Sequence, residues 1–236
     1  MKVAAISHLG LLRDENQDRV VIDGTVLGSN ICEVSEFDVG PFTLLAVIDG
    51  MGGHPAGGVA AAIVADVLAS GFRQLRTAED AERLVSEAND ELYTMMGRVP
   101  ALSRMGAVVA GVFTAADGLV VFNVGDARVY LHSGGYLMQA SIDDRHPSDR
   151  RGFLTQSLGG LHTRSPIGVH LSSEPYISGT VLVASDGLSD DVPHDRLAEA
   201  VSGTPAQAAR RLLDDALAAG GHDNISLGLL ELPEND

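Results

Sequence analysis

Four apolar or glycine-rich stretches of this chain adjoin an aspartate: Asp49, Asp126, Asp186 and Asp223. The first three close runs rich in valine and leucine, which are typical of buried strands, and the fourth precedes such a run. A carboxylate at the end of a buried strand is costly unless a cation meets it. Several of them at one end of a sheet would form a site for hard divalent cations.

Composition narrows the class of protein. The chain has 236 residues, 45% of them hydrophobic, which is enough for one substantial core, and we expect a single domain over residues 1–236. No apolar run is long enough to predict a membrane span. The net charge of -16 argues against a nucleic-acid partner. A single cysteine excludes an internal disulfide, and the short apolar N-terminal run predicts a strand rather than a signal peptide, so we expect a cytoplasmic protein. The oligomeric state is left open.

Turn residues and periodicity predict many strands and two pairs of helices. The expected strands cover residues 2–8, 18–24, 42–48, 106–114, 119–125, 127–133, 136–140, 167–174, 179–185 and 224–232. The strands 127–133 and 136–140 are expected to form a hairpin across Gly134-Gly135. The expected helices cover 57–75 and 77–98, with Thr77 and Asp80 placed as a capping box, and two more follow the 179–185 strand, the second starting at Thr204-Pro205. This order favours an α+β fold with largely antiparallel sheets, and two face-to-face sheets with a helix pair on each flank would fit it.

The segment Asp49-Gly50-Met51-Gly52-Gly53-His54 is the strongest local signal. Asp49 could bridge two cations, and Gly50 would let its backbone carbonyl approach a metal. The alternative is a glycine-rich turn that caps a helix, which the apolar strand before it disfavours.

Asp186 and Asp190 are four residues apart. In a helical turn they would share a face and repel each other unless a cation lies between them. The alternative is a solvated acidic turn. Asp126 and Asp223 are weak signals alone, and only the whole set of aspartates indicates a metal site.

Arg13 stands five residues before Asp18 in a polar loop. Arginine suits a pair of phosphate oxygens, and Asp18 could join the metal site. For Arg13, the alternative is an ordinary surface charge. His54 and His222 are potential proton donors, and a structural role is the alternative for each.

In this order and spacing, the motifs resemble the bacterial form of the metal-dependent protein phosphatases of the type 2C (PPM) family. The segments that carry the resemblance are Arg13-x-x-Asn16-Gln17-Asp18, Val47-Ile48-Asp49-Gly50-Met51-Gly52-Gly53-His54, Asn123-Val124-Gly125-Asp126-Ala127-Arg128-Val129-Tyr130, Ala184-Ser185-Asp186-Gly187-Leu188 and Gly220-Gly221-His222-Asp223-Asn224-Ile225.

The resemblance implies a four-layer αββα sandwich and the hydrolysis of phosphoserine and phosphothreonine in proteins by a metal-bridging hydroxide. It implies two Mn²⁺ or Mg²⁺ ions bridged by Asp49. Asp186 and Asp223 would complete one ion's site, and the Gly50 carbonyl with Asp18 would serve the other.

The remaining implied roles belong to Arg13, Asp126 and Asp190. Arg13 would hold the substrate phosphate and, with Asp49, form the catalytic set. Asp126 and Asp190 match the positions that, with Asp186, bind a third metal ion in bacterial members.

The chain departs from the family pattern in two places. Met51 stands where eukaryotic relatives have a histidine, so His54 is a candidate proton donor by proximity, with metal-bound water as its rival. The sequence also passes almost at once from residues 141–148 to 154–159, where bacterial relatives carry a mobile flap. We therefore expect the flap to be largely deleted and the site more open; an ordered lid over Asp49 from residues 141–160 would contradict this.

The leading hypothesis is a phosphatase that acts on phosphorylated proteins, with a Ser/Thr kinase and its targets as partners. A second hypothesis is a catalytically weak phosphoprotein-binding module with the same fold. A third, a metal-dependent phosphodiesterase or nuclease, is disfavoured by the acidic charge and by Arg13.

Overall fold

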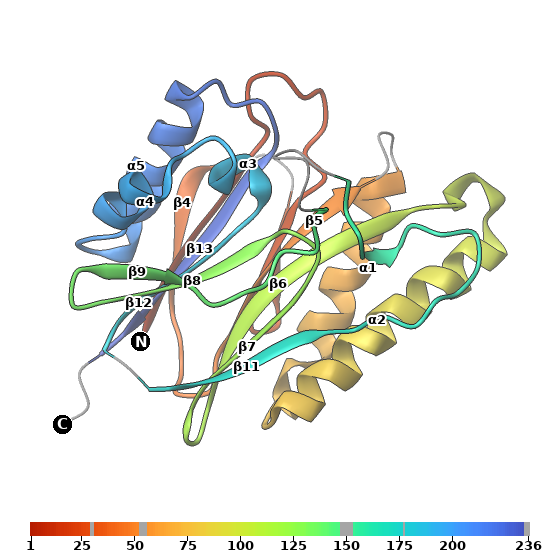
Figure 1. The fold of residues 1–236 in the computed structure, drawn as a ribbon, viewed down its shortest axis with the longest axis horizontal. Coiled ribbons are helices and arrows are strands. Elements are labelled where there is room, and N and C mark those ends of the chain that lie inside the picture. Colours follow the sequence, from red (N-terminus) through yellow and green to blue (C-terminus); the bar gives the residue numbers. More distant parts are fainter. Residues whose placement is uncertain (29–30, 52–55, 147–152, 177, 234–236) are drawn as a thin grey trace.

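Two antiparallel β-sheets pack face to face, and each carries helices on its outer face (Figure 1). The computed structural model describes the chain except for residues 29–30, 52–55, 147–152, 177 and 234–236. The first sheet has the order β4 (Ile31–Asp38), β1 (Lys2–His8), β13 (Ile225–Leu232), β12 (Gly179–Ala184), β8 (Arg128–Ser133) and β9 (Tyr136–Gln139). The second has the order β11 (His170–Pro175), β7 (Gly118–Val124), β6 (Gly106–Ala115), β5 (Leu44–Met51), β2 (Arg19–Ile22) and β3 (Thr25–Gly28), with the short β10 (Leu158–Gly159) beside β6.

The helices form the outer layers. The second sheet is covered by α1 (Ala56–Gly71) and α2 (Ala78–Arg98), and the first by α4 (His194–Ala200) and α5 (Pro205–Ala218). Shorter turns are α3 (Asp186–Ser189), directly after β12, and the 3₁₀ segments η1 (Phe72–Gln74) and η2 (Pro100–Leu102). The predicted αββα sandwich is therefore confirmed.

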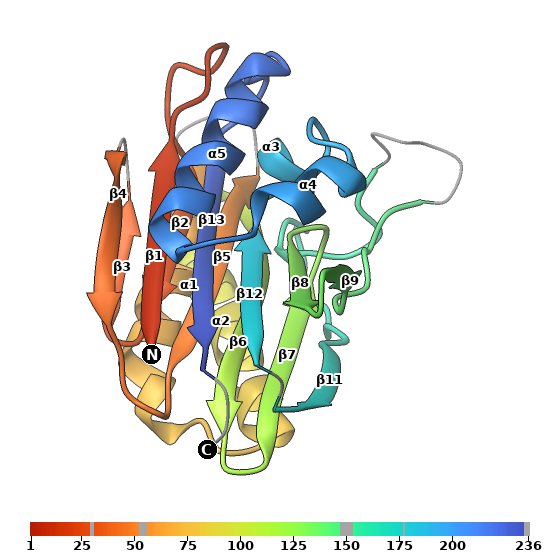
Figure 2. The same cartoon turned by 90° about the vertical axis from the view of Figure 1, so that its left-hand side faces the viewer.

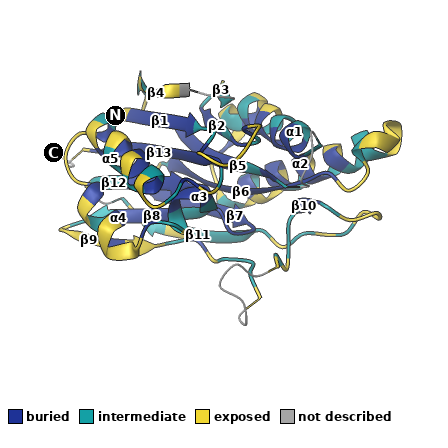
Figure 3. Cartoon of the chain, turned by 90° about the horizontal axis from the view of Figure 1, so that it is seen from above, coloured by how far each residue is buried: buried dark blue, intermediate teal, exposed yellow. Residues whose placement is uncertain are grey.

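Strand β5 shows why its sequence is an unbroken apolar run. Leu45 and Val47 pack in the core between the two sheets, whereas Ala46 and Ile48 pack under α1 and α2. Because side chains alternate between the faces of a strand, a strand covered on both faces is apolar throughout. Figure 3 shows the central strands, such as β1, β13, β12, β5 and β6, in the dark blue of buried residues, with exposed residues on the outer sides of the helices, in the loops and on edge strands such as β4.

Helix α1 with η1, Ala56–Gln74, is long and apolar enough by length and composition to cross a membrane. The sequence pattern alone predicts no membrane span. In this fold, eight residues of α1 are buried, and the helix packs on α2 and β5. Packing between a sheet and a second helix accounts for its apolar composition.

Most predicted elements are present, and the capping box of α2 is confirmed: Thr77 Oγ1 accepts from Asp80 N at 3.3 Å, and Asp80 Oδ2 accepts from Thr77 N at 3.2 Å. Strands β3 and β4 were not predicted. Both are edge strands, and charged residues such as Glu33 and Glu36 interrupt the apolar pattern of β4, as is common where a strand borders solvent.

Candidate metal centre

The aspartates singled out in the sequence meet at one end of the sandwich, where loops join the strands (Figure 2). Neighbouring strands are antiparallel, so the ends of β5 and β12 lie beside the starts of β2 and β13, and the end of β7 lies beside the start of β6. In the second sheet, Asp49 lies in β5 and Asp18 directly precedes β2. In the first sheet, Asp186 starts the turn after β12 and Asp223 lies just before β13, whereas Asp126 lies in the loop from β7 to β8 that joins the two sheets. The site therefore spans both sheets.

Two adjoining cavities contain most of these residues. The larger, of about 570 Å³, is lined by Arg13, Asp49, Gly50, Asp126, Asp186 and Asp223 among others. The smaller, of about 290 Å³, shares four of these residues, Arg13, Asp126, Asp186 and Asp223, and adds Asp190 and Arg145. The structure thus brings together the predicted substrate anchor and the predicted metal ligands, and Asp18 is buried beside them.

Asp18 provides a test of whether this site fits a cation. Its Oδ2 accepts a hydrogen bond from Ser185 Oγ at 2.9 Å, but its Oδ1 is buried and has no hydrogen-bond partner among the described residues. Burial, together with the charges of Asp186 and Asp223, raises the pKa of Asp18 to about 7. A bound cation would satisfy the orphaned oxygen and favour the ionised form, so the residues present fit a metal.

The other central carboxylates are perturbed for the same reason. Burial, and then the charges of Asp18, Asp223 and Asp126, raise the pKa of Asp49 well above its ordinary value. Burial and the charges of Asp49 and Asp126 do the same for Asp186. Like charges so close together disfavour one another's ionised forms, and cations relieve that cost.

Two arginines enter this acidic site. Arg13 donates to Asp223 Oδ2. Arg145 donates to Asp126, Asp186 and Asp190. Among the described residues, no group of three His, Cys, Asp or Glu side chains is arranged to hold an ion; the arginines contact several of the oxygens that an ion would use.

Asp186 and Asp190 were considered as residues of one helical turn. The two residues do lie on one helical turn, α3 with its C-cap at Asp190. The guanidinium of Arg145 lies between their carboxylates, 3.1 Å from Asp186 Oδ2 and 2.7 Å from Asp190 Oδ2. This arginine has no role in the predicted site, and a third metal ion at these residues stays a prediction.

Gly50 is required for a reason that the sequence did not reveal. A Cβ at this position would collide with the Gly57 carbonyl group and lie 2.9 Å from the Gln17 carbonyl oxygen. The close approach of three backbone segments therefore demands glycine here. Gly50 also lines the larger cavity, as its predicted role requires.

Asn224 is a positioning residue that the sequence analysis did not assign. Its Oδ1 accepts from Gln17 N at 2.9 Å, and its Nδ2 donates to the carbonyls of Leu9 at 2.9 Å and Glu15 at 3.0 Å. These bonds fasten the loop that carries Arg13 to the start of β13. Only the Asp-Asn pair in the motif could have indicated it.

The two candidate histidines have different outcomes. His222 Nδ1 lies 2.9 Å from Asp191 Oδ2, which gives it a structural partner. His54 lies outside the described residues. Met51 ends β5 and is half-buried beside the larger cavity.

The described parts of residues 141–160 lie beside the site, and backbone contacts join the two ends of the segment. Arg145 and Leu154 form an antiparallel bridge, His146 N donates to Phe153 O at 3.2 Å, and Leu154 lines the larger cavity. Residues 147–152 lie outside the described part of the chain. The deletion of the flap stays a prediction.

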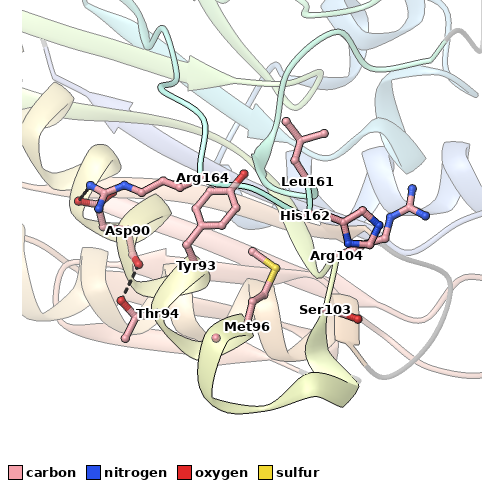
Figure 4. Close-up of a pocket in the computed structure, with 10 residues that line it drawn as sticks. Asp90, Tyr93, Thr94, Met96, Ser103, Arg104, Leu161, His162 and Arg164 are labelled. Carbon is pink, nitrogen blue, oxygen red and sulfur yellow. Dashed lines mark hydrogen bonds and ion pairs between the residues drawn. The ribbon is translucent and has the colours of Figure 1, made fainter.

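A separate cavity of about 420 Å³ lies between α2 and the segment after β10 (Figure 4). Arg164 forms an ion pair with Asp90 at its edge, and Thr94 Oγ1 donates to Asp90 O at 2.9 Å. It contains none of the predicted site residues.

Comparison with known proteins agrees with the fold and the site. The family model described as Protein phosphatase 2C matches residues 32–219. The serine/threonine protein phosphatase PstP of Mycobacterium tuberculosis is 28% identical over an alignment that covers 100% of this chain and 46% of that protein, so the chain spans about half its length. The serine/threonine phosphatase stp of Listeria monocytogenes is 31% identical and is covered to 84%, by 80% of this chain.

A solved structure is also similar over nearly the whole chain. The catalytic domain of PstP in complex with two manganese ions has a TM-score of 0.81 and 27% identity, and the match covers 99% of this chain and 100% of that one. The family model, the Listeria relative and the shared sandwich together establish that this chain belongs to the protein phosphatase 2C family.

Proposed function

We propose that this chain hydrolyses phosphoserine and phosphothreonine in proteins, in a reaction that depends on Mn²⁺ or Mg²⁺. The observation that carries the proposal is the convergence of Asp18, Asp49, Asp186 and Asp223 on one site, with a buried oxygen of Asp18 left without a partner. Family membership and the phosphatases named above support it.

The proposed ligands divide between two ions. Asp49, Asp186 and Asp223 would hold one ion, and Asp49, the Gly50 carbonyl and Asp18 would hold the other. Bound divalent ions lower the pKa of the attacking water and screen the charge of the phosphate. Ser185, which donates to Asp18 Oδ2, orients that carboxylate so that Oδ1 remains available.

Arg13 is the proposed phosphate anchor. Its side chain is 51% exposed, and it lines both cavities. A guanidinium at the mouth of an acidic site can donate two parallel N–H hydrogen bonds to two phosphate oxygens, which orients the phosphorus toward the carboxylates. The hydrogen bonds of Asn224 hold the loop that carries Arg13 in place.

The partners and the location are part of the proposal. The substrates would be phosphorylated proteins, including a Ser/Thr kinase and its targets, in the cytoplasm. The acidic net charge of -16 supports protein rather than nucleic-acid substrates.

The test is hydrolysis of a phosphothreonine peptide with and without Mn²⁺, in the wild type and in Asp49→Asn. Loss of an outer-shell partner of a metal alone costs about 10- to 100-fold, so the loss of a ligand shared by two ions should lower kcat/KM at least about 100-fold. Asp66→Asn on α1 is the matched control, because Asp66 is exposed and lines neither cavity.

Three outcomes would contradict the proposal. Turnover that ignores the metal or survives Asp49→Asn would refute the mechanism. A peptide that binds but is not hydrolysed would identify a phosphoprotein-binding module. Preferential cleavage of a phosphodiester would identify the third hypothesis.

A further inference from the structure

We propose that the guanidinium of Arg145 takes the place of a third metal ion in this chain, so that the centre binds two ions and no more. The proposal goes beyond the function proposed above, because it concerns the cluster of Asp126, Asp186 and Asp190 and does not depend on turnover.

Arg145 contacts all three carboxylates of this cluster. Its Nε donates to Asp126 Oδ2 at 2.6 Å, its Nη1 to Asp190 Oδ1 at 2.9 Å and Oδ2 at 2.7 Å, and its Nη2 to Asp186 Oδ2 at 3.1 Å. These are distances of charge-assisted hydrogen bonds. Only 11% of the Arg145 side chain is exposed, so the planar fork of donors fills the space between the carboxylates.

The backbone on both sides fixes this placement. Asp144 N donates to Gly125 O at 2.9 Å, and Gly125 N donates to Asp144 Oδ2 at 2.8 Å. Arg145 and Asp126 are the next residues of these two segments, so the reciprocal bonds set them opposite each other. The ion pair is therefore built into the fold rather than being a chance orientation of a long side chain.

Asp144 is itself anchored from three further directions. Gln156 Nε2 donates to its Oδ2 at 3.0 Å, Thr155 N donates to its carbonyl at 2.8 Å, and His170 Nε2 lies 2.8 Å from its Oδ1. On the other side of the cluster, Arg128 donates to the carbonyl of Ser189 at 3.2 Å, directly before Asp190. Both the cation and its acceptors are thus held by neighbouring elements.

A metal ion and Arg145 would compete for the same oxygens. Arg145 contacts Oδ2 of each of the three carboxylates, and a dication among them would have to displace a buried positive charge from its partners. The residues present therefore do not fit a third ion while Arg145 is in place. The same contact joins the segment after β9 to α3.

The test counts bound Mn²⁺ rather than activity. We expect the wild type to bind two ions per chain in a Mn²⁺ titration, and crystals grown in excess Mn²⁺ to show two anomalous scattering peaks, with none between Asp126 and Asp190. In Arg145→Ala, a third ion should bind between Asp126, Asp186 and Asp190, at least about tenfold more tightly than any third ion in the wild type, a coupling of ordinary size.

Two further variants complete the design. Arg145→Ala with Asp190→Asn should return to two ions, because an oxygen ligand is lost. Arg164→Ala removes an exposed ion pair with Asp90 and should leave the count at two. A third peak at the cluster in the wild type would overturn the proposal, and this measurement needs no variant to fold. Two ions in a folded Arg145→Ala would overturn it as well.

Discussion

The contribution of Asp18 to the free energy of unfolding should fall as the pH rises, provided that no metal is bound. Burial raises its pKa from an ordinary value of 3.8 to about 7, so the folded chain retains a proton that the unfolded chain releases. A raised carboxylate pKa contributes stability that is fully present below pH 3.8 and is lost as the pH rises through about 7. Asp18→Asn does not titrate, and the variant should lack this dependence.

The expected size follows from the pKa. When the pH rises from about 5 to about 8.5, the stability contributed by the Asp18 proton is lost over the interval from about pH 5 to about pH 7. At about 1.36 kcal/mol per pH unit, the total loss is about 3 kcal/mol. The free energy of unfolding of the wild type, relative to that of Asp18→Asn, should therefore fall by about this amount as the pH rises. In one orientation, the asparagine Nδ2 would have no acceptor, which would destabilise the variant by about 1–3 kcal/mol. That cost does not change with pH.

The assay is urea unfolding in EDTA at both pH values, for the wild type and for Asp18→Asn. In Asp18→Asn, loss of the Asp18 charge also lowers the pKa of Asp49. This changes the difference in unfolding free energy between the two proteins in the same direction. Asp66→Asn on the exposed side of α1 serves as the control and should show no such movement. The reasoning would be refuted if the difference in unfolding free energy between the wild type and Asp18→Asn is the same at both pH values, or if it shifts in favour of the wild type at the higher pH.

Two further variants test the local structure. Gly50→Ala should destabilise the protein by about 1–3 kcal/mol or more, because the new Cβ collides with the Gly57 carbonyl group; Gly97→Ala in α2, where a Cβ meets nothing within 4 Å, should instead stabilise it by about 0.4–1 kcal/mol. Equal melting temperatures for these two variants would contradict the packing argument. Thr77→Ala should cost about 1 kcal/mol in chemical denaturation because it removes the capping box with Asp80; an unchanged midpoint would show that the cap contributes nothing.

Local signals were readable in the sequence and distant contacts were not. The capping box at Thr77 and the two-glycine hairpin at Gly134-Gly135 depend on residues a few positions apart, and both are present, with φ of 58° and 83° at the two glycines. The run that forms β5 was also clear, because burial on both faces leaves it apolar throughout. The edge strands β3 and β4 carry no comparable pattern.

The site divides in the same way. The candidate aspartates were found because each adjoins an apolar run or a glycine-rich turn, and their convergence followed from the family pattern. Arg145 was not assigned a role, since its partners are 19, 41 and 45 residues away and nothing in its neighbourhood marks it. Asn224 was missed as a fastening residue because its contacts reach back more than 200 residues to the loop near Glu15.

The division of the ligands between the two sheets has a consequence for how the domain unfolds. Asp18 and Asp49 belong to one sheet, and Asp186 and Asp223 to the other. An ion held by both sets would act as a cross-link between the layers, and neither sheet could separate from the other without releasing it. Metal affinity would thereby stabilise the whole sandwich rather than one loop, by mass action on the folded state.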